Sequence, residues 1–157
     1  MGADEQPPDD PSNPPTVLGD ADLFFFYLRG GRLEEQASKV IEAASAGRVN
    51  LRTSSEVYDD AISALRADEV PLGTVLSFVS DMKAISNSSM PMSAEIAEDA
   101  LSMYMKHGGR RQLSYFDSMH LATAKRYGLP FLTSDQYVIR NAKILGVRTL
   151  DLAHWEP

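Results

Sequence analysis

Short apolar runs of strand length alternate with helical patterns along most of the chain. The runs span residues 16–20, 49–53, 130–133 and 147–150, and longer segments with apolar residues at helical spacing separate them. Strands that alternate with helices are typical of βαβ units, whose crossover helices cover both faces of a parallel sheet. The sequence therefore predicts an α/β fold with a central parallel sheet.

Six helices are expected from the spacing of apolar residues. Ser54 or Ser55 is the predicted cap of the second helix, and Ser93 begins the fourth. The run Leu23–Leu28 fits either a buried helix or a strand. The second helix starts after Ser54 or Ser55 and runs through residue 65. The other five span residues 33–46, 72–85, 93–108, about 115–127 and about 136–145.

Composition limits the class of protein. The chain has 157 residues, of which 43% are hydrophobic and 24% charged, and this fits one globular domain. It contains no Cys, which excludes thiolate zinc sites, iron–sulfur clusters and cysteine nucleophiles. We find neither an apolar run of the ~18 residues that a membrane span needs nor a pattern typical of signal peptides. We therefore expect a cytoplasmic protein without membrane contact.

The net charge of −7 is unevenly distributed. Residues 1–15 carry four acids, five prolines and no Lys or Arg, so we predict a disordered acidic tail there and a folded domain over 16–157. An acidic chain argues against a nucleic-acid partner unless bound metal neutralises the acids. Whether the remaining acids gather in one place therefore decides how the charge is interpreted.

Several carboxylates follow predicted strands. Asp20 ends the first strand, Asp135 follows the strand at 130–133, Asp117 begins the helix at 115–127, and Asp59 or Asp60 lies one turn into the helix after 49–53. Active sites of open parallel sheets form at the carboxyl ends of the strands. Carboxylates that meet there would repel one another unless a divalent cation joined them.

Each acid also has a purely structural interpretation. An Asp at a helix N-terminus is more often a cap than a ligand, and Asp22 could likewise cap the segment Leu23–Leu28. The hypothesis of a metal site therefore depends on the whole group of acids and on their order along the chain, not on any one of them.

Three motifs carry a family resemblance: "VLGDADLFFFYLRGG", "TSSEVYDDAISALR" and "LSYFDSMHLATAKRYGLPFLTSDQYVI". Over residues 16–152 the chain resembles the PIN domain, and closely the VapC-like PIN proteins of archaea and bacteria. The resemblance implies a three-layer α/β/α sandwich around the parallel sheet. It also implies a metal-dependent ribonuclease site built from three or four acidic residues.

The resemblance also assigns roles to individual positions. Asp20, Asp117 and Asp135 match the first and the last two acids and would bind Mg²⁺ or Mn²⁺. Asp22 matches the polar residue after the first acid, and Thr133 matches the hydroxyl residue beside the final one.

The second acid departs from the family pattern, in which it is usually Glu. Asp60 is favoured, Asp59 is a neighbouring alternative and Glu56 a remote one. A shorter Asp would hold the metal less directly, so activity could be weaker than in relatives.

Basic and aromatic residues near these motifs also have both a functional and a structural interpretation. Arg29 and Arg111 are candidates for phosphate contacts, as are Arg32, Arg52 and Arg110, although an Arg at a helix end is at least as often a dipole partner or a solvated charge. His120, one helical turn after Asp117, is interpreted as a packed or hydrogen-bonded helix residue. Phe24–Phe26 are interpreted as core and dimer interface.

The function implied by the resemblance is an endoribonuclease that acts as the toxin of a type II toxin–antitoxin pair. RNA would be the substrate, and a homodimer and a small antitoxin would be the expected assemblies. The alternatives are a housekeeping RNA-processing nuclease and a catalytically weak or inactive PIN-like module that binds RNA or protein. RNA affinity is expected to depend on divalent metal, because the site acids would otherwise repel phosphate.

Overall fold

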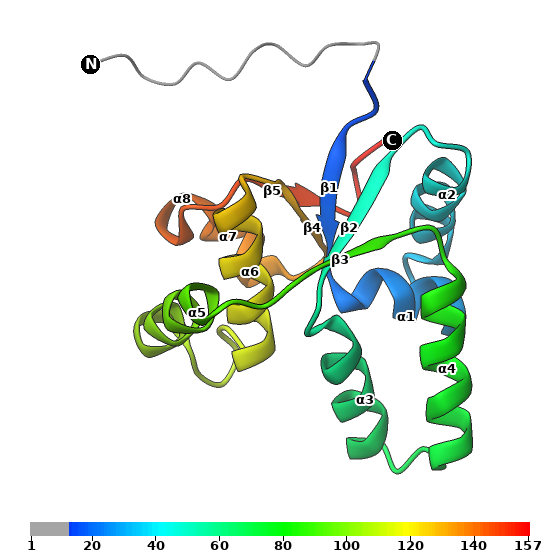
Figure 1. Cartoon of the computed structure of the whole chain (residues 1–157), viewed down its shortest axis with the longest axis horizontal. Helices are drawn as coiled ribbons and strands as arrows, with labels where there is room; N and C mark the ends of the chain where they lie inside the picture. The colour runs from blue at the N-terminus through cyan, green and yellow to red at the C-terminus, as the bar shows by residue number, and fades with distance from the viewer. Residues whose placement is uncertain (1–12) are drawn as a thin grey trace.

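A five-stranded parallel sheet forms the centre of the protein (Figure 1). The computed structural model describes residues 13–157. The strand order of the sheet is β3-β2-β1-β4-β5, and each neighbouring pair of strands is parallel, which confirms the predicted parallel sheet. The strands are β1 (Thr16–Gly19), β2 (Asn50–Ser54), β3 (Ser88–Met90), β4 (Phe131–Thr133) and β5 (Thr149–Asp151).

Helices cover both faces of this sheet and complete the three-layer α/β/α sandwich (Figure 1). The first face carries α1 (Ala21–Arg29), α2 (Glu34–Ser45), α3 (Val57–Ala67) and α4 (Leu72–Ala84). The second carries α5 (Ala94–His107), α6 (Tyr115–Tyr127), α7 (Gln136–Arg140) and α8 (Ala142–Leu145). The run at 23–28, which the sequence left open, is helical.

The two larger of the three hydrophobic clusters in residues 13–157 lie on opposite faces of the central strands. Val17 and Leu132 belong to the core under α1–α4, whereas Leu18 and Phe131 belong to the core under α6–α8. Successive strand residues point to opposite faces, so a short apolar run supplies both cores. This explains why β1 and β4 are apolar at successive positions rather than alternating with polar residues.

Two predicted details were wrong. Neither Ser54 nor Ser55 caps α3, because α3 begins after Glu56 without a side-chain cap, and both hydroxyls bond elsewhere. The helix predicted over 136–145 is broken at Asn141 into α7 and α8, and the Asn141 side chain donates to the carbonyl of Tyr137. The edge strand β3 was not predicted, because Ser88–Met90 has no apolar pattern.

The predicted tail lies, up to residue 12, outside the described residues. Pro14 and Pro15, its last two residues, accept hydrogen bonds from the Asn50 side chain at 3.4 Å and the Asn50 backbone at 2.8 Å. Among residues 13–157, no helix combines the length and apolar character that crossing a membrane requires.

Candidate active site

Five carboxylates line one cavity of about 590 Å³ at the carboxyl ends of β1 and β4. Asp59 is exposed and does not line this cavity, and neither does Glu56. The topology that brings the acids together is the one expected for a parallel sheet, since β1 and β4 are neighbours. The carboxylates are those of Asp20, Asp22, Asp60, Asp117 and Asp135.

Asp20 is the most buried of these acids, with 6% of its surface exposed. It is the N-cap of α1, and its Oδ1 accepts from the backbone N–H of Ala21 at 2.7 Å. Its Oδ2 accepts from the hydroxyl of Thr133 at 2.6 Å. Thr133 in turn accepts from the backbone N–H of Asp135 at 3.0 Å, so one hydroxyl links the first and last acids.

Asp22 joins α1 to the loop after β4. Its Oδ2 accepts from the backbone N–H of Ser134 at 2.8 Å and also from the Ser134 hydroxyl. Its Oδ1 is buried and has no hydrogen-bond partner within residues 13–157. A buried carboxylate oxygen without a donor is costly, and it is a favourable ligand for a cation.

Asp117 and Asp135 are helix caps as well as cavity residues. Asp117 forms a capping box with Ser114, in which Asp117 Oδ2 accepts from the Ser114 backbone at 2.9 Å and the Ser114 hydroxyl accepts from the Asp117 backbone at 3.1 Å. Asp135 caps α7 and accepts from the backbone N–H of Tyr137 at 2.9 Å. Asp117 and Asp135 can therefore cap their helices and line the cavity at the same time.

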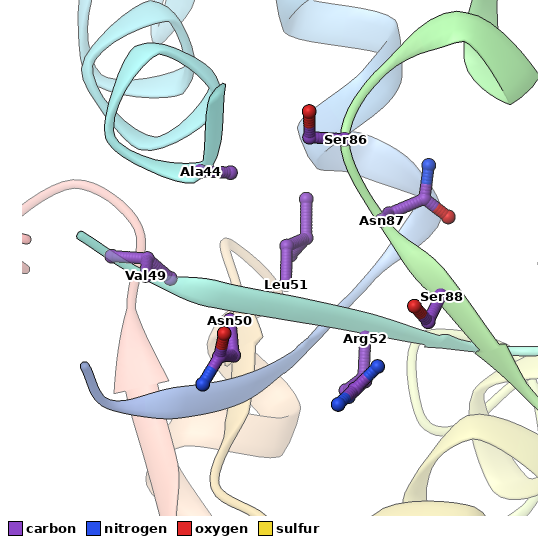
Figure 2. Close-up of a pocket in the computed structure, with 8 residues that line it drawn as sticks. All are labelled: Ala44, Val49, Asn50, Leu51, Arg52, Ser86, Asn87 and Ser88. Carbon is purple, nitrogen blue, oxygen red and sulfur yellow. The ribbon is translucent and has the colours of Figure 1, made fainter. Parts of the chain in front are cut away.

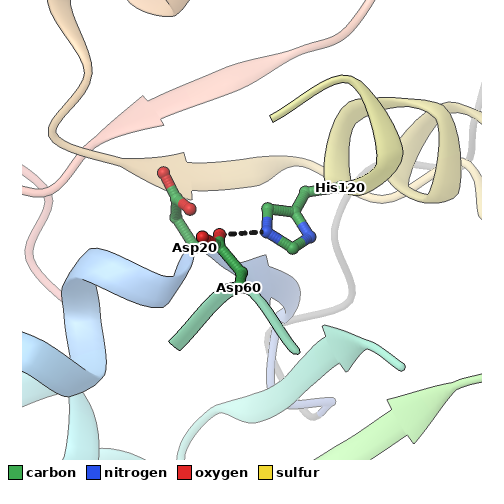
Figure 3. A group of neighbouring side chains, drawn as sticks. All are labelled: Asp20, Asp60 and His120. Carbon is green, nitrogen blue, oxygen red and sulfur yellow. Dashed lines mark hydrogen bonds and ion pairs between the residues drawn. The ribbon is translucent and has the colours of Figure 1, made fainter. Parts of the chain in front are cut away.

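Asp60 is hydrogen-bonded to His120 (Figure 3). Asp60 Oδ2 lies 2.7 Å from His120 Nε2, and His120 Nδ1 lies 2.6 Å from the Ser54 hydroxyl. Ligating atoms of Asp20, Asp60 and His120 all lie within 4.8 Å of one another. Asp20 directly follows β1, Asp60 lies in α3 and His120 lies in α6. Figure 3 shows the three side chains close together.

Burial and mutual repulsion raise the pKa values of three of these acids. Burial raises the pKa of Asp20 well above its ordinary value, and the charges of Asp22 and Asp117 raise it further. Burial is also the main cause of the raised pKa values of Asp22 and Asp117. Within residues 13–157, no Lys or Arg forms an ion pair with any of the five carboxylates.

The donor set fits a hard divalent cation. It consists of carboxylate and hydroxyl oxygens, which Mg²⁺ and Mn²⁺ prefer, and it includes the unpartnered Oδ1 of Asp22. Arg32 also lines the cavity, and its guanidinium lies 5.6 Å from the ring centroid of Phe26. The site therefore places one exposed cation beside a cluster of acids.

The other predicted cationic residues lie away from the acids. Arg29 lines a separate cavity of about 210 Å³ with residues of α3 and α4, and Arg111 is exposed in the turn before α6 with φ of 64°. Arg52 lines a third cavity, of about 290 Å³, between the end of α2 and strands β2 and β3 (Figure 2). In that view Leu51 points toward Ser86, whereas Asn50 and Arg52 point away from it.

Sequence reasoning missed two features of the site. Ser54 was assigned to a helix cap but contacts His120, and Ser134 was not singled out although it holds Asp22. Helical spacing places His120 on the same face of α6 as Asp117, and this was the available signal for its proximity to the acids. The pairing with Asp60 joins residues sixty positions apart, so no local pattern could indicate it.

A match to a family model shows which protein family the chain belongs to. The model described as PIN domain matches residues 17–144, which is most of the chain and contains all five cavity acids. The protein belongs to the PIN-domain family. No curated protein matches the sequence.

Solved structures with a similar fold come from several bacteria. A toxin–antitoxin complex from Klebsiella pneumoniae is 18% identical, with 90% of this chain and 99% of that chain covered and a TM-score of 0.53. VapBC2 from Rickettsia felis, bound to a DNA fragment from its promoter, is 11% identical, with coverage of 87% and 98% and a TM-score of 0.63. FitAcB from Neisseria gonorrhoeae is 15% identical, with coverage of 88% and 99% and a TM-score of 0.54. These likenesses show a shared PIN fold.

Proposed function

We propose that this PIN-domain protein is a metal-dependent endoribonuclease that hydrolyses RNA phosphodiester bonds. The observation that carries the proposal is the convergence of five carboxylates in one cavity, without a Lys or Arg ion-pair partner within residues 13–157. Repulsion and burial make such a cluster unfavourable unless a cation neutralises it. Family membership supports nuclease chemistry, since PIN domains are typically nucleases.

The residues that would hold Mg²⁺ or Mn²⁺ are Asp20, Asp22, Asp117 and Asp135, with Asp60 as the second acid of the family pattern. Such an ion makes a bound water more acidic and offsets negative charge on the reacting phosphate. Thr133 fixes the first and last acids through its hydroxyl, and Ser134 fixes Asp22. These bonds hold the oxygens in place before substrate arrives.

Arg32 is the residue best placed to contact an RNA phosphate. Arg32 is exposed and lines the acidic cavity beside Phe26, so its guanidinium would be free to pair with a phosphate once the carboxylates were neutralised by a bound cation. Arg29 and Arg111 lie outside this cavity and would contact only more distant parts of a longer RNA.

We further propose the role of toxin in a type II toxin–antitoxin pair. The support is that the structures of similar fold include toxin–antitoxin complexes, which favours a small antitoxin as partner. A homodimer and a cytoplasmic location belong to the same proposal. A housekeeping RNA-processing nuclease would share the chemistry, and a genomic neighbour encoding a short antitoxin would favour the toxin role.

The decisive experiment separates the charge of Asp117 from its role as a cap. Purified protein is incubated with single-stranded and structured RNA in Mn²⁺, Mg²⁺ or EDTA, alongside Asp117→Asn and Ser114→Ala. Ser114→Ala removes the hydroxyl half of the capping box and should cost about 1 kcal/mol of stability. Asp117→Asn keeps an oxygen that can accept from the Ser114 backbone N–H, so its fold should be disturbed no more than that of Ser114→Ala. Only Asp117→Asn removes a carboxylate from the cavity.

We expect cleavage by the wild type with Mn²⁺ or Mg²⁺ and none in EDTA. Asp117→Asn should reduce the rate at least 100-fold, whereas Ser114→Ala should stay within a few-fold of wild type at a temperature where both are folded. Equal cleavage by Asp117→Asn, or cleavage that persists in EDTA, would overturn the proposal. Metal binding without cleavage of any RNA would instead support the inactive PIN-like module.

A further inference from the structure

His120 is a fully buried histidine whose two ring nitrogens both have polar partners. Its exposed fraction is 0%, and Ser54, its partner at Nδ1, is 1% exposed. The Nε2 contact with Asp60 Oδ2 is 2.7 Å, and Asp60 lines the acidic cavity. The chain of three residues therefore runs from the protein interior to the edge of the site.

The chemistry of the partners fixes the direction of these hydrogen bonds. A carboxylate oxygen only accepts, so the short contact to Asp60 requires a proton on His120 Nε2. In the uncharged ring Nδ1 is then an acceptor, and the hydroxyl of Ser54 must donate to it. Ser54 thus selects the tautomer in which His120 donates to Asp60.

We propose that His120, oriented by Ser54, is a positioning residue that holds the carboxylate of Asp60 at the metal site. The inference rests on the proposed function, because it gives Asp60 the role of the second acid. Asp has one methylene fewer than the Glu usual in the family, and its carboxylate therefore depends more on being held toward Asp20. The hydrogen bond leaves the other oxygen of Asp60 available to a cation or its bound water.

His120 could instead bind the metal directly, because its ligating atom lies within 4.8 Å of those of Asp20 and Asp60. The structure favours positioning, since Nε2 is already engaged by Asp60 and Nδ1 by Ser54. A hydrogen-bonded partner behind a ligand typically changes metal affinity 10- to 100-fold.

The test measures Mn²⁺ binding by electron paramagnetic resonance, together with RNA cleavage. His120→Leu removes both hydrogen bonds at similar volume, whereas His120→Gln can still present an N–H toward Asp60. Ser54→Ala removes only the outer partner. Thr123→Val is the matched control, because Thr123 is a fully buried hydroxyl on the same helix that bonds to the Met119 carbonyl and not to the site.

We expect His120→Leu to weaken Mn²⁺ binding about 10-fold and to lower kcat more than it changes KM. His120→Gln should recover most of this loss, and Thr123→Val should bind Mn²⁺ as the wild type does. In the Asp60→Ala background, His120→Leu should cause no further loss, because residues acting through one another are not additive. If His120→Leu does not fold, Ser54→Ala should show a smaller loss that also disappears in Asp60→Ala.

Three outcomes would overturn positioning. They are unchanged Mn²⁺ affinity in folded His120→Leu, losses that add to those of Asp60→Ala, and a nitrogen hyperfine coupling that shows His120 bound to the metal. Failure of the proposed function is separable, because a wild type that cuts no RNA can still show His120-dependent Mn²⁺ binding. Conversely, metal-dependent cleavage that His120→Leu leaves unchanged overturns only the positioning role.

Discussion

Asp20 serves two purposes at one position: it caps α1 and lies in the acidic cavity. The cap bond uses Oδ1, and Thr133 uses Oδ2, so both oxygens are oriented before any ligand binds. The burial that orients them also raises the pKa of this carboxyl group. Such a group opposes folding while it is charged and unpaired, which is a common property of functional sites.

Asp20→Asn should therefore stabilise the metal-free protein and abolish activity. The amide keeps an acceptor for the Ala21 N–H but removes a buried charge beside Asp22 and Asp117. We expect a gain of about 1 kcal/mol in EDTA, or roughly 2–4 °C in Tm for a domain of this size. Thermal unfolding by circular dichroism measures it.

Asp59→Asn is the control, since it removes one charge from the exposed neighbour of Asp60 and should leave both Tm and activity near wild type. A metal-free Asp20→Asn that melts below the wild type would show that the hydrogen bonds of Asp20 outweigh its repulsion.

Residue types at strand ends were enough to predict most of the acidic set. Asp20, Asp117 and Asp135 follow from their places after a strand or at the head of a helix, and all three line the cavity. The His120–Asp60 bond could not be predicted, because it depends on how α3 and α6 meet across the sheet. Long-range side-chain pairs have no local sequence pattern.

At the scale of elements, caps and glycines fix where helices end and hence where the acids lie. Gly108 ends α5, six residues before the cap of α6, so it helps to set the start of the helix that carries Asp117. A Cβ at Gly108 would clash with the carbonyl oxygen of Tyr104 and with its ring. The backbone oxygen cannot move away without disturbing the last turn of α5.

Gly108→Ala should consequently lower stability by about 1–3 kcal/mol. Gly73→Ala provides a matched control, because Gly73 lies within α4 and a Cβ there would have no atom of the described residues within 4 Å. That substitution should instead stabilise the protein by about 0.5–1 kcal/mol. Urea unfolding compares the two, and equal effects would show that the contact with Tyr104 is relieved without cost.

Helices with clear start and stop residues were predicted well, and the edge strand, which has no apolar pattern, was not predicted. Helix α6 matches its predicted span, because a capping box and Gly128 at φ of 65° define both ends. Among residues 13–157, strand β3 pairs only with β2 at the sheet edge, and its residues Ser88 and Ser89 are exposed. An exposed edge strand needs few apolar residues. β3 is held by backbone pairing with β2, by the contact between the Thr53 and Ser89 hydroxyls at 3.5 Å, and by Met90, which packs against the core under α6–α8.

For the whole molecule, the net charge of −7 is partly concentrated at one point. Five of its 22 acids line a single cavity, and three of them have raised pKa values in the folded protein. An acidic protein can therefore meet RNA if metal neutralises this cavity, since a bound cation changes the local charge that a phosphate encounters. Protons and metal ions compete for these clustered carboxylates, and the outcome of that competition affects the stability of the fold.

That competition predicts an unusual pH dependence of stability without metal. The folded pKa values of Asp20, Asp22 and Asp117 lie above their ordinary value of 3.8, so the folded state binds more protons than the unfolded state over the pH range above 3.8. The free energy of unfolding in EDTA should then rise as pH falls from 7 toward 5. Urea unfolding at several pH values measures this slope.

Saturating Mn²⁺ should reverse the slope. Metal binds the ionised carboxylates and competes with protons, so its stabilisation grows with pH, reaching about 2.7 kcal/mol when the ion is at 100 times its Kd. Asp20→Asn should flatten the metal-free slope and weaken the response to Mn²⁺, whereas Asp59→Asn should change neither. A metal-free protein whose stability falls steadily from pH 7 to 5, with the same slope in Mn²⁺, would show that the cavity acids do not control the stability of the fold.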